Sequence, residues 1–144
     1  SGTPWGAKRM GKISKIGSGY GIDTSKVAEE LCQTLWLAGG CMLHKKENLI
    51  LANYYPYLGK AYAEDLIHSI ILTKSGINLF NVKSATCFIE KPILNSSTYS
   101  LYADYRIRLY INELKGTSKL RVYIWYGVRQ CIRFYKDNKK ILTN

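Results

Sequence analysis

The segment from Leu101 to Asn112 constrains the fold most, because apolar and polar residues alternate along it without a break. One set is Leu101, Ala103, Tyr105, Ile107, Leu109 and Ile111, and the other is Tyr102, Asp104, Arg106, Arg108, Tyr110 and Asn112. A period of two residues is typical of a β-strand with one face on a core and the other in solvent. The segment therefore predicts a half-buried strand.

A partner strand is predicted after the turn at residues 115–118. Its inward positions are Leu120, Val122, Ile124 and Tyr126, and its outward positions are Arg121, Tyr123 and Trp125. Gly127 suits a bulge or bend. Beyond it, Val128, Ile132 and Phe134 alternate with Arg129, Cys131, Arg133 and Tyr135. We expect the two segments to form an antiparallel hairpin.

Upstream of this hairpin the sequence predicts two helices and further short strands. Residues 25–37 and 61–73 have apolar residues at helical spacing. Asp23 or Thr24 suits the start of the first helix, and Gly76 the end of the second. Short strands are predicted at residues 41–44 and 49–55 and within residues 77–90. The expected fold is α+β, with two helices packed on one face of a four- to five-stranded antiparallel sheet.

The chain has 144 residues, the usual size of one domain. Residues 1–22 predict a basic, glycine-rich N-terminal arm, because their six glycines make a stable helix costly. The run from Gly17 to Gly21 favours a hinge over a phosphate-binding loop, since no Gly-Lys-Ser/Thr ending follows it. Residues 23–144 are expected to form a single α+β domain.

The net charge of +11 is the strongest indication of function, and it is concentrated at the two ends of the chain. Residues 1–22 contain four basic residues and no acidic one, while residues 23–103 contain seven of each. Residues 104–144 contain ten basic and three acidic residues. Basic blocks of this kind favour partners such as nucleic acids and anionic lipid surfaces, although some basic proteins have no such partner.

The outer face of the predicted hairpin is rich in arginine and aromatic residues, a combination typical of surfaces that bind single-stranded nucleic acid. The predicted nucleic-acid-binding residues are Arg106, Arg108, Tyr110, Arg121, Tyr123, Trp125, Arg129, Arg133 and Tyr135. The arm is expected to add contacts through Trp5, Lys8, Arg9, Lys12 and Lys15. The same residue types are enriched at protein–protein interfaces. Self-association and internal packing therefore remain alternatives for this face.

Taken together, these features predict a non-enzymatic basic binding protein whose partner is RNA or another single-stranded nucleic acid. The alternative is a self-assembling structural protein, a homo-oligomer similar in layout to small viral matrix or coat proteins, that contacts nucleic acid or an anionic membrane surface. A small enzyme is a third hypothesis, and its only candidate cluster is Glu64, Asp65 and His68. Polar pairs at this spacing are common on exposed helix faces, which favours a structural role.

Four widely spaced cysteines and two histidines contain no Cys-x-x-Cys pair, so neither a metal nor another cofactor is predicted. Thiols in a chain of this size favour a reducing compartment, which indicates an intracellular protein, cytoplasmic or nuclear, or a virion component if the protein is viral. No apolar run is long enough to predict a transmembrane segment.

Overall fold

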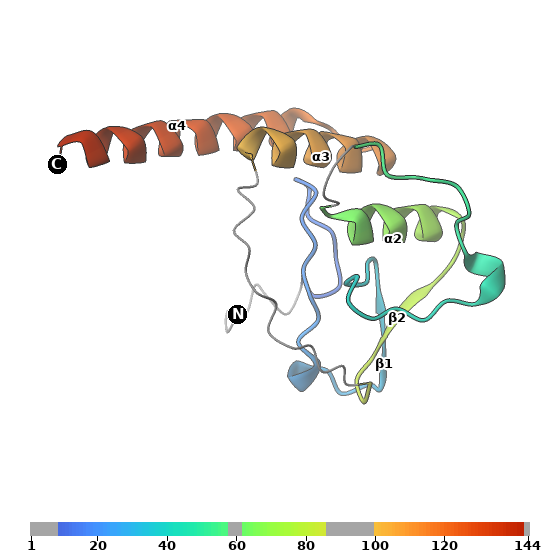
Figure 1. Ribbon diagram of the computed structural model, residues 1–144. Coiled ribbons are helices and arrows are strands. Elements are labelled where there is room, and N and C mark those ends of the chain that lie inside the picture. Colours follow the sequence, from blue (N-terminus) through green and yellow to red (C-terminus); the bar gives the residue numbers. More distant parts are fainter. Residues whose placement is uncertain (1–8, 58–61, 86–99, 143–144) are drawn as a thin grey trace. The chain divides into compact units, whose positions relative to one another are not determined.

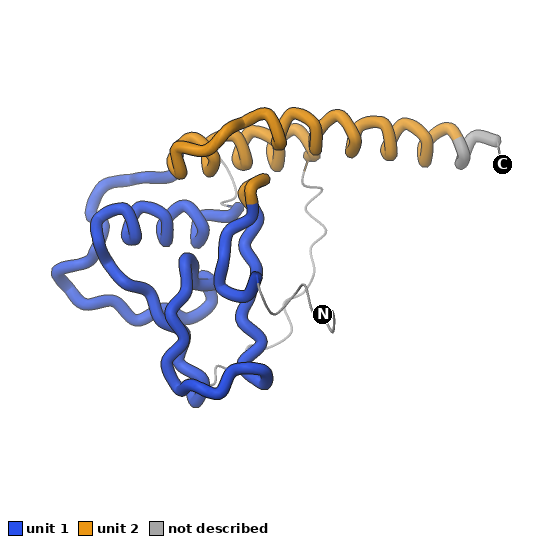
Figure 2. The backbone as a smooth tube through the Cα atoms, turned by 180° about the vertical axis from the view of Figure 1, so that it is seen from behind, with its two compact units in different colours: residues 1–14, 18–97 blue, residues 15–17, 98–144 orange. Residues whose placement is uncertain are grey.

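The computed structural model describes residues 9–57, 62–85 and 100–142 (Figure 1). The chain divides into two compact units, one made of residues 1–14 and 18–97 and the other of residues 15–17 and 98–144 (Figure 2). Each unit is a part of the chain whose residues contact one another more than they contact the other part. The arm boundary expected at residue 22 stays a prediction.

In its described residues, the first unit contains one short sheet and one regular helix. Its elements are η1 (Thr24–Lys26), β1 (Leu31–Thr34), η2 (Lys46–Asn48), α2 (Glu64–Lys74) and β2 (Leu79–Val82). β1 and β2 pair antiparallel, with Leu31 opposite Val82 and Thr34 opposite Leu79. Gly76 follows α2 with a φ of +81°, a left-handed conformation that favours glycine and turns the chain toward β2.

Among the described residues of this unit, α2 provides most of the buried apolar side chains. Leu66, Ile67, Ile70 and Leu72 are buried, and Leu79 of β2 is buried as well. Leu66 and Ile67 are four and three residues from Ile70 and share one helix face with it, whereas Leu72 lies on another side of the helix. Ser69 is also buried, and its hydroxyl accepts a hydrogen bond from the Leu37 amide at 3.1 Å.

The chain from Gly11 to Tyr20 folds back on itself as a hairpin in which Ile13 and Gly19 form an isolated β-bridge. Gly19 is required by packing, since a Cβ built there would lie 2.5 Å from Cε2 of Trp36. The indole Nε1 of Trp36 donates a hydrogen bond to the Tyr20 carbonyl at 3.0 Å. This hairpin is therefore fixed against Trp36.

The second unit contains the helices α3 (Leu101–Leu114) and α4 (Leu120–Leu142). Ser100 begins α3, and its hydroxyl accepts a hydrogen bond from the Ala103 amide at 3.0 Å. Ile107, Ile111 and Val122 are buried. Asn112 is fully buried, and its side chain donates to the Arg108 carbonyl at 2.9 Å and accepts from the Thr117 hydroxyl at 2.7 Å.

The expected four- to five-stranded sheet is wrong, because the described residues contain only the two strands β1 and β2 together with three α-helices. The two segments predicted as a hairpin of strands are the helices α3 and α4. Residues four apart lie on one side of a strand and also on one face of a helix. Ile107 and Ile111 therefore fit both interpretations, and the spacing of these two residues does not distinguish a strand from a helix.

The first predicted helix is also wrong. Asp23 does cap a turn, since its carboxylate accepts from the Ser25 amide at 3.3 Å, but that turn ends at Lys26. Residues 31–34 pair with β2 instead of continuing a helix. The strands predicted at residues 41–44 and 49–55 are absent from the described structure there, which has only η2 between them. The second predicted helix is confirmed as α2, and the strand within residues 77–90 as β2.

Candidate functional site

The nine predicted nucleic-acid-binding residues lie on two helices rather than on one sheet face. Arg106, Arg108 and Tyr110 belong to α3, and the other six belong to α4. Residues that alternate along a strand point to several sides of a helix. The structure therefore separates this set into groups with different surroundings.

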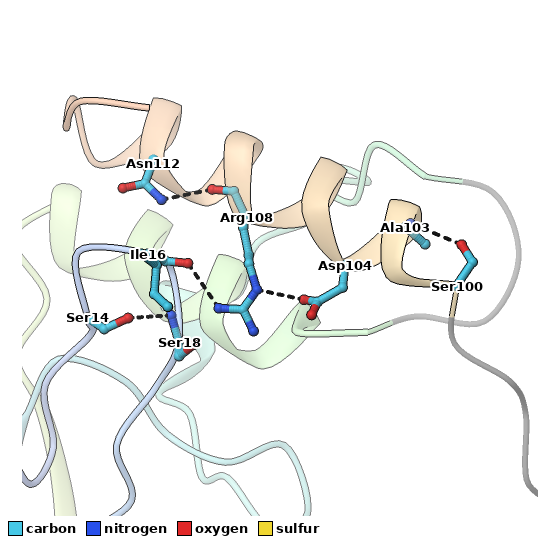
Figure 3. Close-up of polar contacts among 8 residues, drawn as sticks. All are labelled: Ser14, Ile16, Ser18, Ser100, Ala103, Asp104, Arg108 and Asn112. Carbon is cyan, nitrogen blue, oxygen red and sulfur yellow. Dashed lines mark hydrogen bonds and ion pairs between the residues drawn. The ribbon is translucent and has the colours of Figure 1, made fainter. Parts of the chain in front are cut away.

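Arg108 and Trp125 serve the packing of the two helices. The Arg108 guanidinium forms an ion pair with Asp104 at 2.8 Å, donates to the Ile16 carbonyl at 3.0 Å, and lies 4.3 Å from the centroid of the Trp125 ring. Figure 3 shows the Arg108 side chain reaching between Asp104 and Ile16. The side chains of Arg108 and Asp104 are only 14% and 20% exposed. These contacts join α3 to α4, and a role of Arg108 and Trp125 in binding nucleic acid stays a prediction.

Tyrosines fill the space beside this pair. Tyr105 of α3 stacks on Tyr126 of α4 with ring centroids 4.2 Å apart, and Tyr123 lies 6.2 Å from Tyr105. The exposed Arg106 lies over the ring of Tyr102, 5.9 Å from its centroid. These aromatic groups pack against one another between α3 and the first part of α4, which accounts for much of the tyrosine in this region.

Basic side chains form a stripe along the second half of α4. Arg129, Arg133 and Lys136 are all exposed, and their spacing of four and three residues places them on one side of the helix. We call these three residues the basic stripe. Arg133 also lies 3.9 Å from Asp137, in a pair whose side chains are both 65% exposed, so solvent screens the interaction. The sequence prediction missed Lys136, which becomes part of the stripe only at helical spacing.

The opposite side of α4 is apolar and exposed. It consists of Leu120, Ile124, Val128, Ile132, Phe134 and Tyr135, which we call the apolar face. Their exposed fractions range from 43% for Ile132 to 71% for Phe134. At about 100° per residue these positions span roughly 160° of the helix surface, and the exposed Arg121 of the predicted site lies within the same arc near the start of the helix. Tyr135, predicted as part of the arginine-rich face, lies on this apolar face instead.

The predicted arm contacts are described only in part. Trp5 and Lys8 lie outside the described residues. A guanidinium nitrogen of Arg9 donates to the Tyr20 hydroxyl at 3.3 Å, and the group lies 5.6 Å from the centroid of that ring. Lys12 and Lys15 are exposed. Arg9 is thus anchored on the hairpin of the first unit, while the two lysines face solvent.

The acid and histidine cluster considered from the sequence lies around an open hollow of about 460 Å³. The His68 ring is 5.0 Å from that of His44 and 5.2 Å from that of Tyr54, and Glu64 and Asp65 line the same hollow. Burial, with a smaller contribution from the charge of His44, lowers the pKa of His68. Its buried Nδ1 has no hydrogen-bond partner in the described structure. His68 is therefore held in its neutral form at neutral pH.

This cluster lacks the arrangement of a metal centre. In the part of the chain that the structure describes, no three His, Cys, Asp or Glu residues are grouped so that they could hold a metal ion. The Asp65 carboxylate is already engaged, because it accepts hydrogen bonds from the amides of Leu66 at 2.7 Å and Gly39 at 3.3 Å. Asp65 thus joins the start of α2 to the loop at Gly39.

No protein-family model matches the chain, and no curated protein or solved structure compared with it matches either. Among the described helices, none combines the length and the apolar character needed to cross a bilayer. The candidate site is α4, whose basic stripe and apolar face occupy opposite sides of one helix.

Proposed function

We propose that this chain is a non-enzymatic protein that binds nucleic acid through the basic stripe of α4. The observation that supports this proposal is the stripe itself, three exposed cations on one side of a helix. α4 contains six basic residues and one acidic residue, so it contributes +5 to the net charge of +11. Lys and Arg side chains supply the phosphate contacts that dominate affinity for nucleic acids.

The geometry favours contacts to phosphates over stacking of bases. From Arg129 to Lys136 the stripe is about 10 Å long at ~1.5 Å per residue. A DNA duplex carries about six phosphate charges over that distance, at one per ~1.7 Å. Trp125, the largest ring of the predicted platform, is half-buried under Arg108, which leaves Tyr123 as the exposed aromatic residue beside α3. We therefore propose sequence-independent binding, with RNA or single-stranded DNA as the first ligands to test.

The test compares two triple variants that remove the same charge. Arg129→Gln/Arg133→Gln/Lys136→Gln removes the stripe, and Lys45→Gln/Lys46→Gln/Lys74→Gln removes three exposed lysines of the first unit. Binding of a labelled single-stranded RNA is followed by fluorescence anisotropy over a range of salt concentrations. The stripe variant is expected to bind more weakly and to lower the slope of log K against log salt by about two, since each phosphate contact on a single strand contributes ~0.7.

The matched lysine variant is expected to bind like the unchanged protein. Equal losses in the two variants would mean that net charge and not the stripe determines binding, and the site would then be wrong. No binding of the unchanged protein at low salt would reject the function itself.

A cytoplasmic or nuclear location, where nucleic acids are found, belongs to this proposal. The alternative of a self-assembling matrix-type or coat-type protein stays a prediction, and an enzyme is not proposed.

A further inference from the structure

The apolar face of α4 is exposed along more than three helical turns. Every residue from Gly127 to Asn138 is exposed, and Leu120 and Ile124 extend the same face toward the start of the helix. Single exposed apolar residues are common on protein surfaces, but a continuous patch of this kind marks an interaction site. The face therefore requires an occupant.

α3 is not that occupant, because it packs against other sides of α4. Between Leu120 and Asn138, the buried or half-buried residues of α4 are Val122, Trp125 and Tyr126, and Trp125 and Tyr126 contact Arg108 and Tyr105 of α3. Around the helix, Val122 and Tyr126 lie about 120° to 160° from Ile124 and Val128, whereas Trp125 lies at the edge between the two sides, about 60° from Val128. Both views show α4 continuing past the start of α3 (Figures 1 and 2).

A second copy of α4 fits this face poorly. Two helices pack as a coiled coil through residues spaced alternately three and four apart, preferably Leu, Ile or Val. That spacing from Ile124 gives Val128, Cys131, Tyr135, Asn138 and Leu142, so three successive seam positions between Val128 and Leu142 are not aliphatic. A second helix of charge +5 would also add repulsion along the whole contact.

An anionic lipid surface fits the same face well. Helices that lie in the plane of a membrane interface have bulky apolar residues on one side and Lys or Arg on the other, as α4 has. Such a helix sits about 5–10 Å deep, and its diameter is about 10 Å, so its polar side lies at the level of the headgroups. Tyr123 and Tyr135 have exposed rings, and the polar hydroxyl on an apolar ring suits the interfacial zone. The positive charge of the helix complements anionic headgroups.

We propose that the second half of α4 docks on the surface of an anionic bilayer, with the helix lying in the interface and its apolar face toward the acyl chains. This proposal does not depend on nucleic-acid binding, because Val128, Ile132 and their neighbours are not part of the basic stripe.

The test is cosedimentation with phosphatidylcholine vesicles that either contain or lack phosphatidylserine. The unchanged protein is expected to bind the vesicles that contain phosphatidylserine. Val128→Gln/Ile132→Gln is expected to weaken this binding about tenfold or more, because two aliphatic side chains no longer leave water. The matched control is Leu43→Gln/Leu51→Gln, which makes the same chemical change at two leucines that are 99% and 95% exposed in the first unit. The control is expected to bind like the unchanged protein.

Further measurements make each result decisive. Val128 and Ile132 are exposed and glutamine is a good helix former, so circular dichroism is expected to show unchanged helix content. Should that variant lose helix, Phe134→Gln repeats the test at a residue that is 71% exposed. Sedimentation velocity of the unchanged protein is expected to show a monomer, and the anisotropy assay to show RNA binding that Val128→Gln/Ile132→Gln leaves intact.

Three outcomes would overturn the proposal. The first is failure of the unchanged protein to bind phosphatidylserine vesicles. The second is vesicle binding that the apolar-face variants leave intact, since charge alone would then explain it. The third is a dimer in solution that Val128→Gln/Ile132→Gln dissociates, which would assign the face to a second copy of the chain.

Discussion

The guanidinium of Arg108 lies over the ring of Trp125, 4.3 Å from its centroid, and so joins α3 to α4 through a cation–π contact. The same guanidinium pairs with Asp104 and donates to the Ile16 carbonyl. One side chain thus links both helices and the short segment at residues 15–17. Arg108 is expected to be the most important charged residue for the stability of this unit.

Replacement of Arg108 by alanine is expected to lower the free energy of unfolding by about 1–3 kcal/mol, because a partly buried, charge-assisted hydrogen bond and a cation–π contact are lost together. Arg106→Ala removes an exposed arginine from the same helix and is expected to cost about 0.5 kcal/mol or less. Urea unfolding followed by circular dichroism measures both. Similar losses in the two variants would contradict the role given to Arg108.

Gly19 and Gly21 provide a matched pair for the packing of the first unit. Gly19→Ala is expected to destabilise the protein by about 1–3 kcal/mol, because the new methyl group overpacks a filled site. The methyl would approach the Trp36 ring to 2.5 Å, whereas nothing lies within 4 Å of one at Gly21. Gly21→Ala is therefore expected to change stability little. Thermal unfolding of the two variants compares them, and equal melting temperatures would show that Trp36 does not pack there.

Gly127 tests the helical nature of α4. It lies inside the helix, is exposed, and has nothing within 4 Å of an added Cβ. Gly127→Ala is expected to raise the free energy of unfolding by about 0.5–1 kcal/mol, the difference in helix propensity between the two residues. The increase is measured by urea unfolding together with the helix signal at 222 nm by circular dichroism. A loss of stability would indicate that this segment is not a helix.

The neutral state of His68 predicts a pH dependence of stability. Its pKa is lowered from 6.5 in the folded protein, so the unfolded chain binds this proton more readily. Well above pH 6.5 the titration of His68 does not affect the free energy of unfolding. As the pH falls below 6.5, it lowers that free energy and so destabilises the fold. His68→Gln is expected to reduce the loss of stability on mild acidification, as measured by urea midpoints above and below pH 6.5. An NMR titration of the His68 ring that gives a pKa above 6.5 would contradict the assignment.

Sequence patterns predicted α2 and β2 because local signals agree there. The apolar residues of α2 recur at helical spacing, and Gly76 ends the helix in a conformation that favours glycine. β1 was missed because its pairing depends on β2, which lies more than forty residues further along the chain. A propensity that is weak within one segment is easily overridden by such a distant partner.

The error at α3 and α4 has a different cause. A strand places Ile124 inside and Trp125 outside, but in the structure Ile124 is 59% exposed and Trp125 is half-buried under Arg108. Ser100 before the segment and the Asp104–Arg108 pair four residues apart are helix signals present in the sequence. The abundance of tyrosine and β-branched residues, which are favoured in strands, outweighed them. Of the predicted site, Arg106, Arg121, Arg129 and Arg133 are exposed in the structure. The grouping of Arg129, Arg133 and Lys136 follows only from helical spacing, and their role in binding stays a prediction.

Residues 15–17 are part of the helical unit, although their neighbours on both sides are part of the other. The Ile16 carbonyl accepts a hydrogen bond from Arg108, and a Cβ at Gly17 would lie 3.2 Å from Ile111. A truncation that begins after residue 22 therefore removes a structural component of the helical hairpin together with the basic terminus. A loss of binding in such a deletion would not distinguish damage to the helical unit from the loss of a contact with the partner. Point substitutions at Lys12 and Lys15 are therefore the appropriate way to study that end of the chain.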